Sequence, residues 1–83
     1  MSNRKRLIWR CRRGMKELDV LLEPFAGAGL PGITDDELGS FEALLEAQDT
    51  DLLAWFTGAS EPNDPALREM VERVLAHKRN LGG

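Results

Sequence analysis

The stretch Arg12-Arg13-Gly14-Met15-Lys16-Glu17-Leu18-Asp19 divides the 83-residue chain into a basic and an acidic part. Seven Lys or Arg residues and no acidic residue precede Glu17, whereas Glu17 to Leu67 carries twelve Asp or Glu residues and no Lys or Arg. Gly14 lies between two segments with helical periodicity, and glycine adopts positive φ at low cost. The junction therefore predicts two helices joined by a turn at Gly14.

Apolar residues on both sides of this junction repeat with helical spacing. Residues 3–12 and 15–25 each place one apolar stripe toward a core. Pro24 is expected to end the second helix near residue 25, because proline disfavours helical geometry at the residue before it. The two stripes consist of Leu7, Ile8 and Cys11, and of Leu18, Leu21, Leu22 and Phe25.

Three further helices are predicted after a flexible Gly/Pro loop at residues 26–33. Neither a strand signal nor an internal repeat is present in the sequence. The fold class is therefore all-α, a small five-helix antiparallel bundle in which residues 1–83 form a single domain. The expected helix signals are a capping box at Thr34–Glu37, a cap at Asp49 or Thr50, a stop at Gly58, and a cap at Asp64 followed by Pro65.

Length and composition exclude several classes of protein. A chain of 83 residues has no room for a separate catalytic domain. Its net charge of −3 argues against general affinity for nucleic acid. Its single cysteine, Cys11, excludes an internal disulfide and a cysteine-based zinc site. The longest apolar run, residues 52–56, is too short to span a bilayer, and no secretory signal is visible. We expect a cytoplasmic protein in a bacterium, or a mitochondrial matrix protein only in a eukaryote.

Two apparent chemical motifs favour structural interpretations. Gly27-x-Gly29-x-x-Gly32 matches a dinucleotide-binding fingerprint, but no strand precedes it, so it is interpreted as an interhelical loop. Cys11 lies on an apolar stripe and is expected to be a packed core thiol. His77 lies near the end of the last helix and is expected to be solvated. The acidic residues have no spacing that predicts a metal site.

The junction itself allows two interpretations. It can be a simple turn with an Arg13–Glu17 surface ion pair worth about 0–1 kcal/mol. It can also be a protein-docking patch, because a glycine lets another backbone approach closely between orientable charged groups. The basic amino-terminal segment offers a further alternative, nucleic-acid binding through phosphate contacts, although the acidic remainder of the chain would repel a polyanion.

The junction resembles the signature of a known family. Arg13-Gly14-x-x-Glu17 is similar to the RGxxE motif of the SdhE-type succinate dehydrogenase flavinylation factors. The similarity extends from Trp9 to Phe25 and continues through Asp35-Asp36-Glu37 to Trp55. The Gly/Pro loop at residues 26–33 departs from the family pattern.

The resemblance implies a non-enzymatic, chaperone-like monomer. Such a factor would bind the flavoprotein subunit of succinate dehydrogenase, with that of fumarate reductase as a second client, and promote covalent FAD attachment in a transient complex. It would hold no cofactor tightly, since FAD is the cofactor of the client, and would bind neither nucleic acid nor membrane. The resemblance implies that Arg13, Gly14 and Glu17 engage the client. The predicted partner-binding surface also includes Arg12, Trp9, Lys16 and Asp19.

Overall fold

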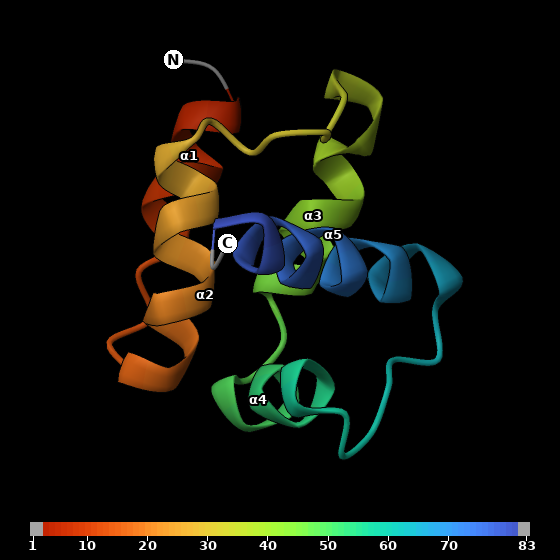
Figure 1. The fold of residues 1–83 in the computed structure, drawn as a ribbon. Coiled ribbons are helices and arrows are strands. Elements are labelled where there is room, and N and C mark those ends of the chain that lie inside the picture. The colour runs from red at the N-terminus through yellow and green to blue at the C-terminus, as the bar shows by residue number, and fades with distance from the viewer. Residues whose placement is uncertain (1–2, 82–83) are drawn as a thin grey trace.

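The fold is entirely helical in the computed structural model, which describes residues 3–81. Five α-helices and one short 3-10 helix follow one another, and no strand occurs within this range. Both the all-α class and the number of helices predicted from the sequence are therefore confirmed (Figure 1). The elements are α1 (Asn3–Arg10), α2 (Lys16–Gly27), η1 (Asp35–Glu37), α3 (Leu38–Leu45), α4 (Asp49–Thr57) and α5 (Pro65–Leu81).

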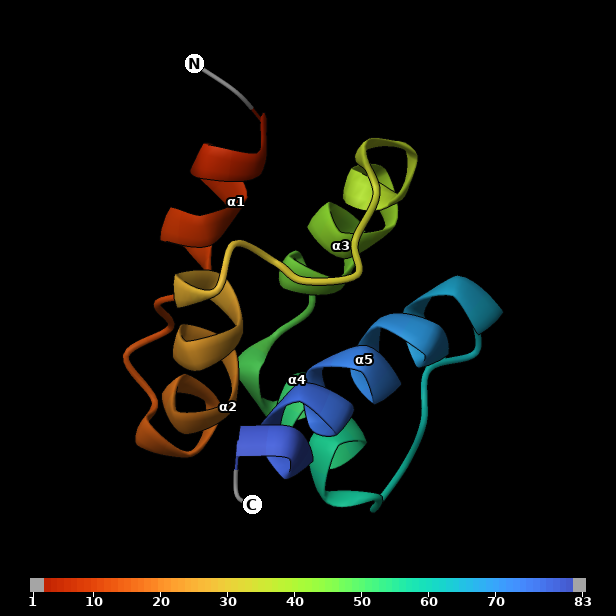
Figure 2. The ribbon, with the colours of Figure 1, turned by 45° about the horizontal axis from the view of Figure 1, so that its top comes forward.

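The helices are arranged so that α5 crosses the others. Helices α1 and α2 lie side by side on one flank, and α3 packs against α1 (Figures 1 and 2). Helix α5 lies across both α2 and α3, while α4 closes one end of the molecule against α2 and α5. The α1–α2 junction is consequently close to the point where α3 leads into α4.

One apolar core receives side chains from every α-helix. Phe25 lies within it, with its ring centroid 5.9 Å from that of Phe41. Burying a side chain of this size contributes roughly 1.5–3 kcal/mol to stability. Residues of the core that are fully enclosed include Leu7, Cys11, Leu18, Leu22, Phe25, Phe41, Leu44, Leu52 and Val74.

Helix α2 continues past Pro24, so the prediction that Pro24 ends it is wrong. The helix extends to Gly27, because Phe25 and Ala26 in its last turn are buried in the core. Tertiary packing of an apolar face stabilises a helix more than intrinsic propensity does. Pro24 has no N–H with which to bond the carbonyl of Val20, and Val20 is an exposed residue.

The loop after α2 is held in place, contrary to the expectation of a flexible connection. Leu30 is buried despite a φ of 57°. The Arg4 guanidinium donates to the carbonyls of Gly29 at 3.1 Å and Ile33 at 2.8 Å. Arg73 donates to the carbonyl of Gly32 from the opposite side. Arginines from α1 and α5 thus fix the loop at several carbonyl groups.

The predicted caps are largely confirmed. Glu37 Oε1 accepts hydrogen bonds from the backbone N–H of Thr34 at 3.0 Å and from its hydroxyl at 3.2 Å. Gly58 ends α4 with a φ of 84°, and Asp64 Oδ1 accepts the N–H of Ala66 at 2.9 Å. The prediction for α4 is wrong, because its N-cap position is Gln48 and no side chain caps it.

Candidate docking site

The turn between α1 and α2 exposes the glycine of the RGxxE motif. Gly14 has a φ of 85° and is exposed, while Met15 is extended with a φ of −100°. A Cβ atom added to Gly14 would meet nothing within 4 Å. The backbone conformation, and not lack of space within the molecule, therefore requires glycine at this position.

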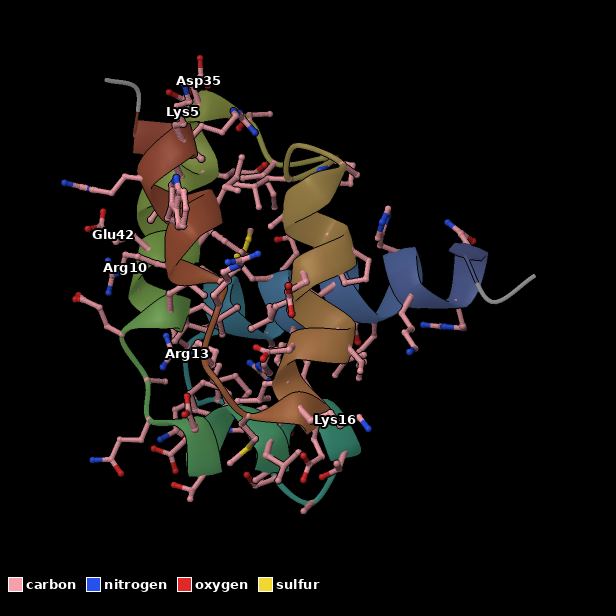
Figure 3. All side chains as sticks on the ribbon, turned by 90° about the vertical axis from the view of Figure 1, so that its left-hand side faces the viewer. Lys5, Arg10, Arg13, Lys16, Asp35 and Glu42 are labelled. Carbon is pink, nitrogen blue, oxygen red and sulfur yellow. The ribbon has the colours of Figure 1, made fainter. Side chains whose placement is uncertain are left out.

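The side chain of Arg13 points inward from this turn. Its Nε donates to Asp49 Oδ1 at 2.8 Å, and its two terminal nitrogens donate to the carbonyls of Leu45 at 2.7 Å and Ala47 at 2.8 Å. Figure 3 shows Arg13 between the α1–α2 turn and the link from α3 to α4. The ion-pair partner of Arg13 is thus Asp49 and not Glu17, which corrects the simple-turn interpretation.

The backbone of Arg13 is held as well. Its N–H donates to Asp19 Oδ1 at 3.0 Å, and the Asp19 N–H donates to the carbonyl of Met15 at 2.9 Å. Asp19 therefore ties the residue before Gly14 to the first turns of α2. Two of the predicted site residues, Arg13 and Asp19, make internal contacts that fix the turn.

The remaining site residues face solvent around this turn. Trp9 is 67% exposed and Val20 is 44% exposed; among the described residues these are the exposed large hydrophobic side chains. The Arg12 guanidinium lies 5.7 Å from the Trp9 ring centroid, and its Nε is 3.8 Å from Glu23 Oε1. An exposed indole with a stacked cation is the kind of anchor that protein interfaces favour.

The exposed face of α2 carries a charged pair around Val20. Lys16 and Glu17 are exposed and precede Val20 by four and three residues, so helical geometry places them on neighbouring positions of one face. Figure 3 shows the Lys16 side chain directed away from the chain. Val20 was not predicted as a site residue, although its position opposite the buried stripe of α2 was a signal for exposure.

Two shallow depressions extend along α2 from this turn. They share Glu23, and the lining of each includes both charged and apolar residues. One, of about 600 Å³, is lined by Gly14, Lys16, Asp19, Val20, Glu23 and Pro24. The other, of about 190 Å³, lies between α1 and α2 and is lined by Ile8, Cys11, Arg12, Glu23, Ala26 and Gly27.

The basic amino-terminal segment is largely neutralised by acidic residues from later in the chain. Arg4 lies 3.1 Å from Asp35, and Arg6 and Arg10 lie 3.3 and 3.5 Å from Glu42. Figure 3 shows Arg10 and Glu42 together on the side where α1 meets α3. This pairing removes much of the charge that the nucleic-acid interpretation needs.

Cys11 and His77 are separate packed groups. Cys11 is fully buried, as predicted, and burial raises the pKa of its thiol to about 11 against the opposing effect of Arg13. The expectation of a solvated His77 is wrong: its ring lies edge-on to Phe25 at 5.5 Å, and Nε2 is buried without a hydrogen-bond partner. Nothing joins the two as nucleophile and base.

Two other properties of the described residues bear on function. Across residues 3–81, no group of three or more His, Cys, Asp or Glu side chains is arranged to hold a metal ion. Within the same part of the chain, no helix has both the length and the apolar character needed to cross a membrane. The described residues do assemble a fixed turn, an exposed tryptophan and a charged helix face, which are features that protein-binding surfaces use.

Comparison with known proteins gives the family. The model of the family described as "Flavinator of succinate dehydrogenase" matches residues 5–78, and the chain belongs to this family. It is 48% identical to the FAD assembly factor SdhE of Pseudomonas aeruginosa over 71 residues, 86% of this chain and 84% of the relative. It is 37% identical to that of a Serratia species over 82 residues, 99% and 93% of the two chains, and 42% identical to that of Vibrio cholerae over 76 residues, 92% and 88%.

Proposed function

We propose that this protein is an FAD assembly factor that binds the flavoprotein subunit of succinate dehydrogenase and promotes covalent attachment of FAD to it. The observation that carries this proposal is the family match over residues 5–78. The geometry supports it, because the RGxxE glycine lies on an exposed, internally braced turn. Under this proposal, the protein acts as a chaperone-like factor and not as an enzyme.

The docking surface in this proposal centres on the turn and the first part of α2. Arg13 and Asp19 hold the turn through their internal hydrogen bonds. Charged groups at the edge give orientation and on-rate, whereas an exposed aromatic side chain gives affinity. The residues proposed to contact the client are Trp9, Arg12, Gly14, Lys16 and Glu17.

The mechanism proposed is orientation of the client. The reactive chemistry belongs to FAD and to the client, and this chain holds the client so that the client residue that accepts the flavin meets the flavin ring. Orientation of reacting groups can lower a barrier by several kcal/mol. The factor then leaves, so the complex with the client is transient. The protein is proposed to act as a monomer. Its proposed compartment is that of its client, the cytoplasm of a bacterium. A fumarate reductase flavoprotein is a second proposed client.

The protein is further proposed to hold no FAD tightly. The depression beside Gly14 is open to solvent, and three of its lining residues, Lys16, Asp19 and Glu23, are charged. Small-molecule sites are instead concave and mostly apolar, with a few placed polar groups. The grooves along α2 are better suited to the surface of a folded client than to a flavin ring.

The test is co-production of the succinate dehydrogenase flavoprotein subunit with and without this protein. Covalent flavin is read as an acid-stable fluorescent band on a denaturing gel. The wild type should give a stronger fluorescent band than the client alone, and Glu17→Ala should give a weaker band than the wild type. The matched control is Glu72→Ala, which truncates an exposed glutamate on α5. An equal band with and without the wild type would refute the proposed function, while full activity of Glu17→Ala would refute the docking site.

A further inference from the structure

The Arg13 side chain joins two helix ends that lie far from it in sequence. Leu45 is the last residue of α3, Ala47 lies two residues beyond it, and Asp49 is the first residue of α4. The last carbonyls of a helix lack intrahelical partners. A cation is favourable at the carboxyl end of a helix, and an anion is favourable at the amino end. At the link from α3 to α4, here called the α3–α4 corner, the Arg13 cation bonds the carboxyl end of α3 and the Asp49 anion lies at the amino end of α4.

The contacts leave Arg13 little freedom. Each of its three side-chain nitrogens donates one hydrogen bond, at 2.7–2.8 Å, and the side chain is only 16% exposed. A guanidinium with fixed fork geometry loses little further entropy on making such bonds. Asp49, 34% exposed, is the charged partner that orients this fork.

The position of the turn depends on the same residue. Arg13 immediately precedes Gly14, and its N–H is bonded to Asp19. Its side chain is bonded to the α3–α4 corner, so the backbone beside Gly14 is fixed from both sides. Removing the Asp49 carboxylate would take away the charged partner of Arg13 and one of its three side-chain hydrogen bonds, without touching any exposed residue of the docking surface.

We propose that Asp49 is a positioning residue for client docking, which acts through Arg13 to fix the turn that presents Gly14 and Glu17. In this arrangement the Arg13 side chain serves the site from inside the protein and is not a client contact. The inference rests on the proposed function, which supplies the client. It adds a functional residue on α4, outside the RGxxE motif.

The binding experiment compares three variants of the full-length protein with purified flavoprotein subunit that lacks covalent FAD. Asp49→Ala should weaken affinity about tenfold, because small displacements of a positioned group are costly. Asp49→Asn should retain most of the affinity, since its amide oxygen can still accept the Arg13 Nε–H. The matched control is Asp51→Ala, which removes another acidic residue from the first turn of α4 and should bind like the wild type.

A second measurement reports on the turn without the client. In nitrogen-15 NMR spectra, the Gly14 amide should shift and the Arg13 amide should exchange faster in Asp49→Ala, but not in Asp51→Ala. Unchanged Gly14 and Arg13 signals, or wild-type affinity of Asp49→Ala, would overturn the inference. Equal losses in Asp49→Ala and Asp49→Asn would also overturn it, because they would indicate a charge contact with the client. Absence of binding by the wild type would instead refute the proposed function.

Discussion

Arg73 and Glu37 form a two-point ion pair that joins α5 to the start of α3. Arg73 Nη1 lies 2.7 Å from Glu37 Oε1, and Arg73 Nη2 lies 2.8 Å from Glu37 Oε2. The hydrogen bonds from Arg73 and then from Thr34 lower the pKa of Glu37 to about 2 from an ordinary value of 4.5. The pair also raises the pKa of Arg73. One carboxylate therefore serves both a helix start and a contact between helices.

The lowered pKa predicts a pH dependence of stability. The folded-state pKa is below the unfolded-state value, so the contribution is fully present above pH 4.5 and is lost as pH falls toward about 2. Urea unfolding of wild type and Glu37→Gln at pH 2 to 6 isolates this contribution. The difference between the two proteins should shrink as pH falls through this window, and a constant difference would contradict the assigned role of Glu37.

Loss of the Thr34 hydroxyl should have a modest effect on stability. Thr34→Ala removes its hydrogen bond to Glu37 and should lower the free energy of unfolding by about 1 kcal/mol, as for other N-cap residues. Chemical denaturation followed by circular dichroism measures the change. Because Thr34 is exposed and its backbone N–H bond to Glu37 remains, a loss several times larger would show that the loop after α2 depends on this cap.

The buried thiol of Cys11 predicts slow chemical modification. Cys11 is fully enclosed, and its pKa of about 11 keeps it protonated at neutral pH, whereas the thiolate is the reactive form. A disulfide reagent such as DTNB should label the native protein far more slowly than the protein unfolded in urea. Equal rates would mean that α1 opens readily from the core.

The parts of the fold that follow local patterns could be predicted from the sequence. The apolar stripes, the stop at Gly58 and the cap at Asp64 all depend on residues within one or two turns of each other. The continuation of α2 beyond Pro24 could not be predicted from the sequence, because burial of Phe25 in a core built from distant helices outweighs the local tendency of proline to end a helix. His77 was predictable in principle, since it lies three residues after Val74 and seven after Met70 on the buried stripe of α5.

The candidate site likewise has features that local sequence predicted and one contact that it did not. The RGxxE motif marked the turn, and helical geometry marked the exposed face of α2. The Arg13–Asp49 contact had no local signal, because these residues are 36 positions apart and acidic residues at a helix start ordinarily indicate capping. Arg13→Ala should therefore destabilise the fold, contrary to the sequence-based expectation for a surface residue.

The motif glycine can be tested against a matched glycine elsewhere in the chain. Gly14 and Gly58 have φ values of 85° and 84°, and a Cβ added to either would meet nothing within 4 Å. Gly14→Ala and Gly58→Ala should therefore cost similar stability, about 1–2 kcal/mol, from the left-handed conformation alone. Thermal melts of the two variants measure this cost directly.

Only the Gly14 variants should affect function if the turn contacts the client. At a temperature where both alanine variants are folded, Gly14→Ala should reduce covalent flavin on the flavoprotein subunit, and Gly58→Ala should not. Gly14→Asn sharpens the comparison, because asparagine tolerates positive φ but projects a side chain toward the client. It should melt closer to wild type than Gly14→Ala and still flavinylate poorly. Full flavinylation by Gly14→Asn would mean that the motif needs the backbone conformation of this turn and not close approach of the client.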